Sequence, residues 1–256
     1  MHFSDTGTGI PLVLLPAFPF DSRLWDRART GLAEYARVIT PDPRGFGRTP
    51  LDDAEPDLAV VAADVVALLD RLSLDRVVLG GCSMGGYVAM AVLRLAPERV
   101  GGLVLIDTRP AADVQQAKEN RYAMAERAER EGVAGWLADQ MLPVLLGPTT
   151  LERRPDVVDT VRRLLEEAPP ASVAWAQRAM AARPDSSATL REAGVPALIL
   201  HGEQDALIPT EAADGMAELL GTEAVVLPET GHLPPLEVPA ELTAAVSGFL
   251  PLGFER

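Results

Sequence analysis

A serine between two glycines is the first group in the chain that could carry out chemistry. Ser83 lies in the segment Gly81-Cys82-Ser83-Met84-Gly85, directly after an apolar run and directly before a helical pattern. In this strand–turn–helix context, a G-x-S-x-G motif presents its serine at the tip of a strained turn. Side chains at the two glycine positions would clash in such a turn. The sequence therefore predicts Ser83 as a nucleophile.

Other glycine-rich motifs fit this segment poorly. A phosphate-binding loop needs a lysine after its last glycine, whereas Gly85 is followed by Gly86 and Tyr87. The segment also lacks the G-x-G-x-x-G pattern of dinucleotide-binding loops. Cys82 precedes the tip of the turn, so we expect it to be a small buried residue and not the nucleophile.

A serine hydroxyl needs a base within hydrogen-bond reach, and the chain offers three histidines. His2 precedes the first core strand, and His201 ends a buried one. His232 lies in a polar loop after the last apolar strand, where a parallel α/β sheet places its functional side chains. We therefore predict His232 as the base. The alternative is a surface-loop histidine without a catalytic role.

The third member of such a triad is an acid that orients the histidine, and here it should fall between the serine and the histidine in the chain. Asp205 follows the apolar run 197–201 in a turn and could accept a hydrogen bond from the His232 ring. It is our prediction for the acid. Asp107, at the end of an earlier apolar run, competes with it but could instead cap the following segment. Glu203 is a third candidate, expected to be solvated.

Attack on a carbonyl creates an oxyanion, which needs two preorganised N–H donors. We expect the backbone N–H of Met84 to be one, because the residue after the nucleophile supplies it in this motif. The other should come from the loop after an early strand, where Phe18 is our candidate. Pro16 and Pro19 lack an N–H and stiffen this loop. The alternative is a proline-rich turn that only closes the core.

Short apolar runs alternate with longer helical patterns along the chain. We predict strands at 12–15, 36–40, 77–81, 103–107, 197–201 and 224–227. Several of these runs have no polar alternation, as expected for strands covered on both faces. The pattern predicts an α/β fold, with a mostly parallel sheet flanked by helices. The turn at residues 7–9 is expected to join two antiparallel strands at the sheet edge.

The alternation breaks between residues 109 and 184, where no convincing strand occurs. Helical segments are predicted at 113–131, 133–141, 149–167 and 171–182, punctuated by Pro143, Gly147-Pro148 and Pro169-Pro170. We interpret residues 109–184 as a helical lid inserted into a core formed by residues 1–108 and 185–256. The alternative is a set of extra helices packed on a face of the sheet.

Composition excludes several classes of protein. The 256 residues carry a net charge of −14, which disfavours binding to nucleic acid or to an anionic membrane. With one cysteine, Cys82, no intrachain disulfide is possible. The apolar runs are too short to span a bilayer, and the start of the chain does not resemble a signal peptide. We therefore expect a soluble cytoplasmic protein. We also expect no metal and no cofactor, because there is no histidine pair at i, i+4 and no cysteine cluster.

These segments together resemble the α/β-hydrolase superfamily over nearly the whole chain. The matching motifs are Pro16-Ala17-Phe18-Pro19, Pro41-Asp42-Pro43-Arg44-Gly45-Phe46-Gly47, the turn around Ser83, His201-Gly202-Glu203-Gln204-Asp205, and Gly231-His232. The chain looks most like the small bacterial esterase and lactonase branch that includes 3-oxoadipate enol-lactonases. It departs from the common pattern at Pro16-Ala17, where the family usually has His-Gly. Dehalogenases and epoxide hydrolases of the superfamily carry Asp where this chain has Ser83.

The residues and the resemblance lead to one functional hypothesis. A small ester or lactone would be hydrolysed through an acyl-enzyme on Ser83. Two alternatives stay open: a non-catalytic receptor for a small ligand, and a perhydrolase or carbon–carbon bond hydrolase using the same residues. Substrate contacts are expected from Phe18, Phe20 and Met84. Within the insertion, the candidates are Trp136, Met141 and Trp175, which could equally be ordinary packing.

Overall fold

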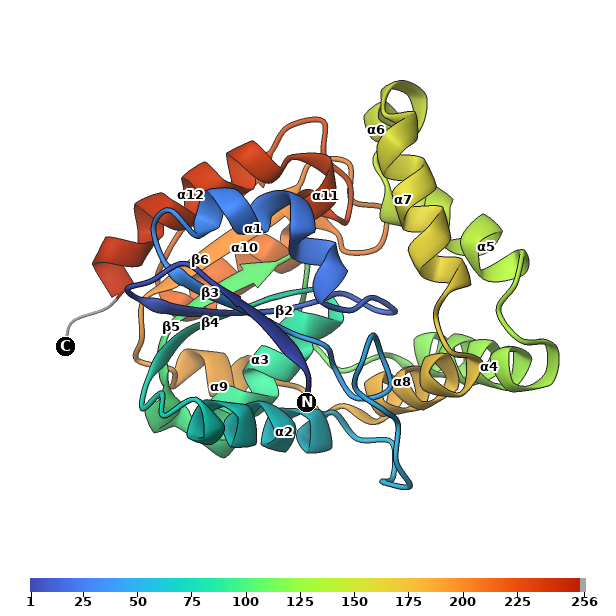
Figure 1. Cartoon of the computed structure of the whole chain (residues 1–256), viewed down its shortest axis with the longest axis horizontal. Helices are drawn as coiled ribbons and strands as arrows, with labels where there is room; N and C mark the ends of the chain where they lie inside the picture. The colour runs from blue at the N-terminus through green and yellow to red at the C-terminus, as the bar shows by residue number, and fades with distance from the viewer. Residues whose placement is uncertain (254–256) are drawn as a thin grey trace.

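The computed structural model describes residues 1–253 and contains a seven-stranded sheet in the order β1-β3-β2-β4-β5-β6-β7 (Figure 1). The strands are β1 (Phe3–Thr6), β2 (Pro11–Leu15), β3 (Arg37–Pro41), β4 (Val77–Cys82), β5 (Val100–Ile106), β6 (Ala197–Gly202) and β7 (Ala224–Leu227). All neighbouring strands run parallel except β1 and β3. The predicted α/β fold with a mostly parallel sheet is confirmed.

Helices cover both faces of this sheet. On one face α1 (Asp26–Leu32) packs against α12 (Pro239–Gly253), which also contacts β5 and β6. On the other face lie α2 (Leu58–Arg71), α3 (Met84–Leu95) and α9 (Ser187–Arg191) (Figure 1). Next to α9, α10 (Thr210–Leu220) contacts β6 and β7. Every residue of β4 and β5 is buried, which explains why these strands read as continuous apolar runs.

The turn at residues 7–9 lies at the sheet edge, but its strands do not pair with each other. β1 pairs with β3, with Phe3 opposite Pro41, while β2 lies on the far side of β3. The prediction was therefore right about the sheet edge and the strand directions. It missed that β3 lies between β1 and β2. Gly7 has a φ of +83°, and a Cβ there would lie 2.3 Å from the Ala36 carbonyl oxygen. Only glycine fits this position without strain.

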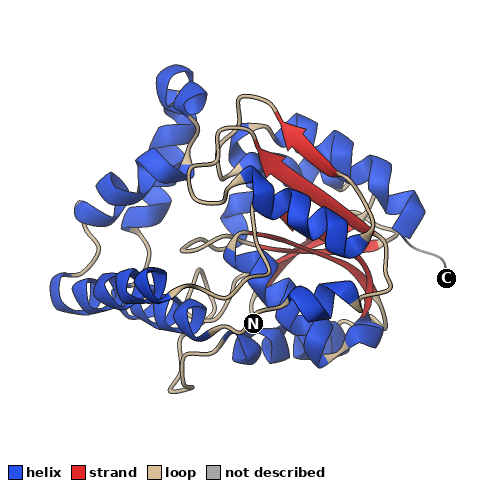
Figure 2. Cartoon of the chain, turned by 180° about the vertical axis from the view of Figure 1, so that it is seen from behind, coloured by secondary structure: helices blue, strands red, loops and turns tan. Residues whose placement is uncertain are grey.

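Six helices lie between β5 and β6, and we refer to the first five as the helical insertion. They are α4 (Gln115–Glu131), α5 (Trp136–Leu145), α6 (Pro148–Arg153), α7 (Pro155–Glu166) and α8 (Pro170–Ala182). In Figures 1 and 2 they gather beyond one end of the sheet and cover neither of its faces. α4 packs along α8, and α5 packs against α7.

Two helix boundaries in the insertion differ from the prediction, and both lie at prolines. Pro143 lies inside α5, which continues to Leu145 instead of ending near residue 141. The predicted helix 149–167 is divided, with α6 ending at Arg153 and Pro155 occupying the first turn of α7. A proline at a helix start needs no N–H partner, so Pro155 begins a new helix more readily than it continues one.

Candidate active site

Ser83 occupies the junction between β4 and α3. Its backbone angles are φ 53° and ψ −113°, a left-handed conformation that a residue with a side chain adopts only under strain. Its N–H donates to the Ile106 carbonyl at 2.9 Å, and its carbonyl accepts from the Thr108 hydroxyl at 2.9 Å. Neighbouring strand β5 therefore helps to hold the strained turn in place.

The glycines around Ser83 are required by close backbone approach. A Cβ at Gly81 would lie 2.1 Å from the Gly85 carbonyl carbon, and a Cβ at Gly85 would lie 2.2 Å from the Leu15 carbonyl oxygen. Side chains at either position would collide with backbone, which cannot move aside cheaply. The clash that the motif predicts at these two glycine positions is therefore found in the structure. Cys82, as expected, is fully buried and burial raises the pKa of its thiol.

His232 and Asp205 lie together at the carboxyl ends of the strands. His232 Nδ1 is 2.7 Å from Asp205 Oδ2, and both side chains are buried. The other oxygen, Asp205 Oδ1, accepts the backbone N–H groups of Leu207 at 2.8 Å and Ile208 at 3.2 Å. The backbone of His232 is also fixed, because its N–H group donates to the Leu145 carbonyl in α5 at 3.1 Å.

The charges of this pair support each other. Burial alone would lower the pKa of His232, but the Asp205 carboxylate outweighs it and raises that pKa above its ordinary value. Burial would raise the pKa of Asp205, but the His232 ring and the two backbone N–H groups hold it below its ordinary value. Asp205 is therefore an ionised acceptor at neutral pH and stabilises a protonated His232.

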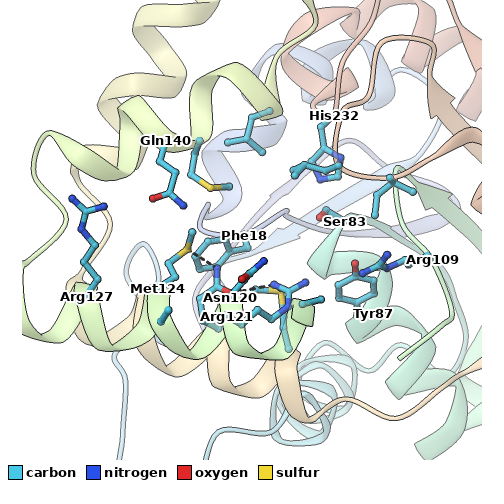
Figure 3. A pocket seen from close by; sticks show the side chains of 18 residues that line it. Phe18, Ser83, Tyr87, Arg109, Asn120, Arg121, Met124, Arg127, Gln140 and His232 are labelled. Atoms are coloured by element: carbon cyan, nitrogen blue, oxygen red, sulfur yellow. Dashed lines mark hydrogen bonds between the residues drawn. The ribbon is translucent and has the colours of Figure 1, made fainter. Parts of the chain in front are cut away.

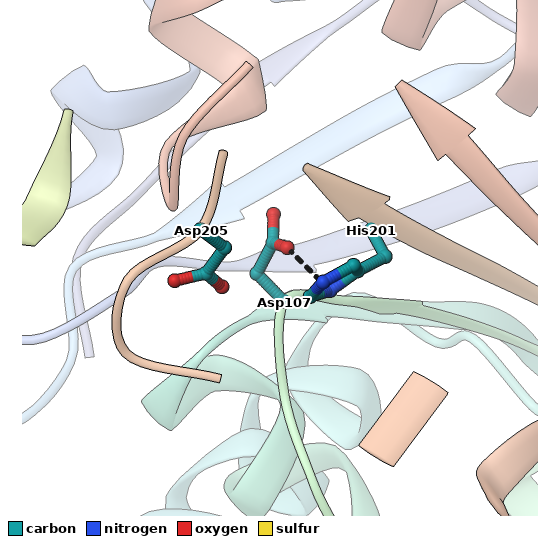
Figure 4. Close-up of side chains that lie close together, drawn as sticks. All are labelled: Asp107, His201 and Asp205. Atoms are coloured by element: carbon teal, nitrogen blue, oxygen red, sulfur yellow. Dashed lines mark ion pairs between the residues drawn. The ribbon is translucent and has the colours of Figure 1, made fainter. Parts of the chain in front are cut away.

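The competing acid, Asp107, contacts the other buried histidine. Its Oδ1 accepts the Gly202 N–H at 2.8 Å and lies 3.1 Å from His201 Nδ1 (Figure 4). In the part of the chain that the structure describes, Asp107 Oδ2 and His201 Nδ1 have no aligned hydrogen bond. Burial raises the pKa of Asp107 to about 6, against the opposing effect of His201. Glu203, the third candidate, is exposed and accepts the Glu229 N–H at 2.9 Å.

Asp107, His201 and Asp205 are the described side chains that come closest to a metal-binding set, with ligand atoms within 4.8 Å of one another (Figure 4). Both Asp205 oxygens are already engaged, one by His232 and one by backbone N–H groups. A metal at this position would compete with His232 and with two backbone N–H groups for the Asp205 carboxylate. The donor set therefore fits the Asp205–His232 pair better than it fits a metal ion.

A pocket of about 560 Å³ opens beside Ser83 and His232. Phe18 lines it from the core (Figure 3). Met141 lines it from the insertion. Four residues expected to contact substrate are not among those that line it: Phe20, Met84, Trp136 and Trp175. The Trp175 indole instead donates to the Ala54 carbonyl at 2.8 Å, which is ordinary packing.

The two proposed oxyanion donors lie on different elements, and Phe18 is the one that lines the pocket. Met84 is the first residue of α3, and the first N–H groups of a helix have no acceptor within that helix. Phe18 lies in a turn closed by the Phe20 N–H, which donates to the Ala17 carbonyl at 2.8 Å. The Phe18 ring packs edge-on against Phe46 with centroids 6.5 Å apart.

Glu237, a carboxylate that organises the His232 loop, was not among the site residues predicted from the sequence. It is buried and accepts three backbone N–H groups, from Gly147 at 2.9 Å, Gly231 at 3.1 Å and Leu233 at 3.0 Å. Gly231 and Leu233 flank His232, and Gly147 belongs to the insertion. Glu237 thus ties the histidine loop to the insertion. The available signal was an acidic residue inside the otherwise apolar segment 233–238.

Three arginines of the pocket were also missed: Arg109, Arg121 and Arg127. Two of them lie on the pocket-facing side of α4, together with Ala117, Asn120 and Met124. The spacing of these positions is that of one helical face, and the face is polar where a core-facing helix would be apolar. This polar face was the signal in the sequence.

Comparison with known proteins establishes the family. The model of the alpha/beta hydrolase family matches residues 12–246, and the chain belongs to this family. A dihydrolipoyllysine-residue acetyltransferase component of the acetoin cleaving system from Pseudomonas putida is 32% identical over 94% of this chain. The chain spans only 64% of that protein's length.

Two solved structures with esterase or lactonase names are similar over almost the whole length. A thermophilic esterase from Thermogutta terrifontis, described as malate-bound, has 41% identity and a TM-score of 0.96, covering 99% of this chain and 94% of its own. The enol-lactonase from Burkholderia xenovorans has 25% identity and a TM-score of 0.86, covering 98% and 96%. These neighbours agree with the esterase and lactonase resemblance. No helix within residues 1–253 combines the length and apolar character needed to cross a membrane.

Proposed function

We propose that the chain hydrolyses a small carboxylic ester or lactone through an acyl-enzyme, with Ser83 as nucleophile, His232 as base and Asp205 as the orienting acid. The observation that carries the proposal is the buried hydrogen bond of 2.7 Å between His232 and Asp205, at the pocket that Ser83 lines. Serine, base and orienting acid in this relation are the components of acyl transfer to serine.

In the first half-reaction, the Ser83 oxygen attacks the carbonyl carbon while His232 takes the hydroxyl proton. The carbonyl oxygen becomes an oxyanion, and the backbone N–H groups of Met84 and Phe18 would stabilise it. His232 then gives its proton to the leaving alcohol oxygen, and the acyl group stays on Ser83. In the second half, His232 takes a proton from water, whose oxygen attacks the acyl carbon. The bond between the acyl carbon and the Ser83 oxygen then breaks, His232 returns the proton to Ser83, and the acid leaves.

Asp205 supports both halves by stabilising the imidazolium that forms at His232. Its carboxylate also fixes which ring nitrogen carries the proton in the neutral state, because Nδ1–H must donate to it. The other nitrogen, Nε2, is then free to accept the Ser83 proton. No group outside these side chains and backbone donors is required by the chemistry.

The helical insertion would act as the lid of this site. Residues 109–184 supply Met141 and Gln140 to the pocket wall, whereas residues 1–108 and 185–256 supply Ser83 and His232. An insertion that covers the pocket in this way would exclude water from the reacting groups and contact the substrate.

The proposal is tested by hydrolysis of p-nitrophenyl acetate and butyrate. Ser83→Ala should lose turnover by roughly 10³-fold or more, because the nucleophile is gone. The matched control is Ser247→Ala on the outer helix α12, which should behave as wild type. A folded wild-type protein that binds these esters without turning them over would contradict the proposal and favour the non-catalytic receptor.

A further inference from the structure

The charge of the pocket is opposite to that of the protein as a whole. The chain has 37 acidic and 23 basic side chains, yet the pocket beside Ser83 is lined by Arg109, Arg121 and Arg127. Among the described residues, no aspartate or glutamate lines it. An anion approaching this protein meets overall repulsion, so a positive pocket must arise from a local arrangement.

That arrangement centres on one buried carboxylate, Asp113. It accepts from Arg109 at 2.7 Å, from Arg183 at 2.9 Å, and from Arg121. Within residues 1–253, Asp113 is the only acidic group that forms an ion pair with any of these three arginines. Three guanidinium groups therefore share one carboxylate, and two positive charges have no counter-charge.

Asp113 itself is firmly ionised. Its side chain is fully buried, and burial alone would raise its pKa. The hydrogen bond from Arg183 and the charge of Arg121 overcome that effect and hold the pKa of Asp113 well below its ordinary value. The excess of two positive charges is therefore present across the pH range in which the protein would work.

The three arginines that contact Asp113 differ in the exposure of their side chains. The Arg183 side chain is 4% exposed and stacks 4.0 Å over the Tyr87 ring, so it is part of the packing. Arg109 and Arg121 are 29% and 20% exposed and line the pocket.

Arg121 Nη1 donates to Gln177 at 3.1 Å and to Met180 at 3.4 Å, so Nη2 is the group of Arg121 that faces a ligand without a partner among the described residues. Arg109 Nε is buried without an acceptor among the described residues. Uncompensated, partly buried charge is costly unless a ligand supplies the partner.

Their position suits a substrate that also reaches the nucleophile. Figure 3 shows Arg109 beside Tyr87 at the Ser83 end of the pocket, and Arg121 beside Asn120 on α4. Arg127 lies far from Ser83 in the same view. Arg127 is also already engaged, by Glu131 at 2.9 Å and by the Trp136 ring at 4.2 Å.

We propose that Arg109 and Arg121 bind a carboxylate of the substrate, so that the enzyme prefers an ester or lactone that carries a second, free carboxylate. The cleavage step of this inference rests on the proposed function. Guanidinium groups pair with carboxylates through two parallel N–H donors, and Asp113 holds the two arginines in place before the ligand arrives.

Turnover of matched ester pairs tests the preference. p-Nitrophenyl hemiglutarate is compared with p-nitrophenyl valerate, and 4-acetoxybenzoate with phenyl acetate, which places the carboxylate on the acyl or on the leaving side. In at least one pair, kcat/KM should be about tenfold or more higher for the anionic ester, the gain expected from a charged hydrogen bond. Equal or lower values for the anionic ester in both pairs would overturn the inference.

Two variants assign the preference to this site. Arg109→Gln and Arg121→Gln should each reduce the anionic-to-neutral ratio of kcat/KM by about tenfold, since each removes one charge. Arg153→Gln is the control, because Arg153 is an exposed arginine of the insertion outside the pocket lining. It should leave the ratio unchanged. A preference that survives both pocket variants would contradict the assignment.

Binding of glutarate, measured by calorimetry, keeps the inference testable if neither ester is cleaved. Glutarate should bind wild type at least about tenfold more tightly than glutaramide does, and Arg109→Gln and Arg121→Gln should each abolish the difference. Glutarate binding without ester turnover would contradict the proposed function and leave the carboxylate site standing. Turnover of neutral esters without any carboxylate preference, and no glutarate binding, would contradict only the carboxylate site.

Discussion

The molecule contains two buried aspartate–histidine pairs close to each other, and they differ in geometry. His232 Nδ1 and Asp205 are hydrogen-bonded at 2.7 Å, at the pocket that Ser83 lines. His201 Nδ1 lies 3.1 Å from Asp107 without an aligned hydrogen bond, and neither residue lines that pocket. One aspartate–histidine pair therefore lies at the pocket, and the other is packed in the interior away from it.

The difference follows from where each histidine sits on the fold. His201 is a residue of strand β6, and its backbone position is fixed by pairing with Val226 of β7. His232 lies in a loop after β7, and Glu237 and the Leu145 carbonyl hold that loop against the insertion. A loop held at both sides can carry a ring out to the pocket while keeping its orientation. Position on the fold, and not residue type, separates the proposed base from the packing histidine.

The largest effect should separate the two histidines. His232→Ala should reduce kcat for p-nitrophenyl butyrate by roughly 10⁴-fold or more, because the base is lost. His201→Gln should change kcat by less than about tenfold, since His201 does not reach the pocket. Both variants are compared at equal folded fraction, measured by circular dichroism. A larger loss in His201→Gln than in His232→Ala would reverse the assignment.

The two aspartates should follow the same order with smaller effects. Asp205→Asn keeps the shape but presents the wrong group to His232 Nδ1, and kcat should fall by roughly 10³- to 10⁴-fold. Asp107→Asn should lower kcat by less than about tenfold, because its contacts are with Gly202 and His201. The measurement is steady-state hydrolysis of both variants under the same conditions. Similar losses would mean that the two carboxylates share the role.

The pH profile should distinguish the pairs more finely. Activity requires neutral His232, so kcat/KM should fall as the pH drops through the pKa of that residue, which Asp205 raises above its ordinary value. The nearby Asp107 and Glu237 charges raise it further. Removing the Asp107 charge in Asp107→Asn should therefore move the acid limb to lower pH. An acid limb that stays in place, or moves up, would show that Asp107 does not act on His232.

Glu237 should affect stability more than chemistry. Glu237→Gln replaces an acceptor of three backbone N–H groups with one acceptor oxygen and one amide, and unfolding free energy should fall by about 1–3 kcal/mol. Glu203→Gln, at an exposed carboxylate with one such contact, is the control and should change it by less than about 0.5 kcal/mol. Urea unfolding of the two variants measures the difference. Equal stabilities would remove the support that we assign to the His232 loop.

Local geometry was the part of the molecule that could be predicted from sequence. The turn around Ser83 demands glycine at fixed offsets, and unbroken apolar runs are typical of strands covered on both faces. These constraints act within a few residues, so they are legible in the chain. They led to the sheet and to the strained serine turn. The proximity of Asp205 and His232, 27 positions apart, followed instead from the shared edge at which parallel strands end.

Contacts between distant segments could not be predicted in this way. Glu237 accepts a hydrogen bond from the Gly147 N–H, 90 positions away in the sequence. Asp113 accepts one from Arg183, 70 positions away. Nothing near either residue in the sequence indicates its partner. The β1 crossover and the helix that continues through Pro143 were missed for the same reason, because tertiary packing overrides the local signal.

The central claim, that Ser83 is the activated nucleophile, is tested most directly by covalent labelling. Wild type is treated with a fluorophosphonate, and the adduct is located by peptide mass spectrometry. We predict one adduct on Ser83 in wild type, and none in Ser83→Ala or, over the same time, in His232→Ala. A folded wild-type protein that takes up no probe, or takes it up on another residue, would contradict the account.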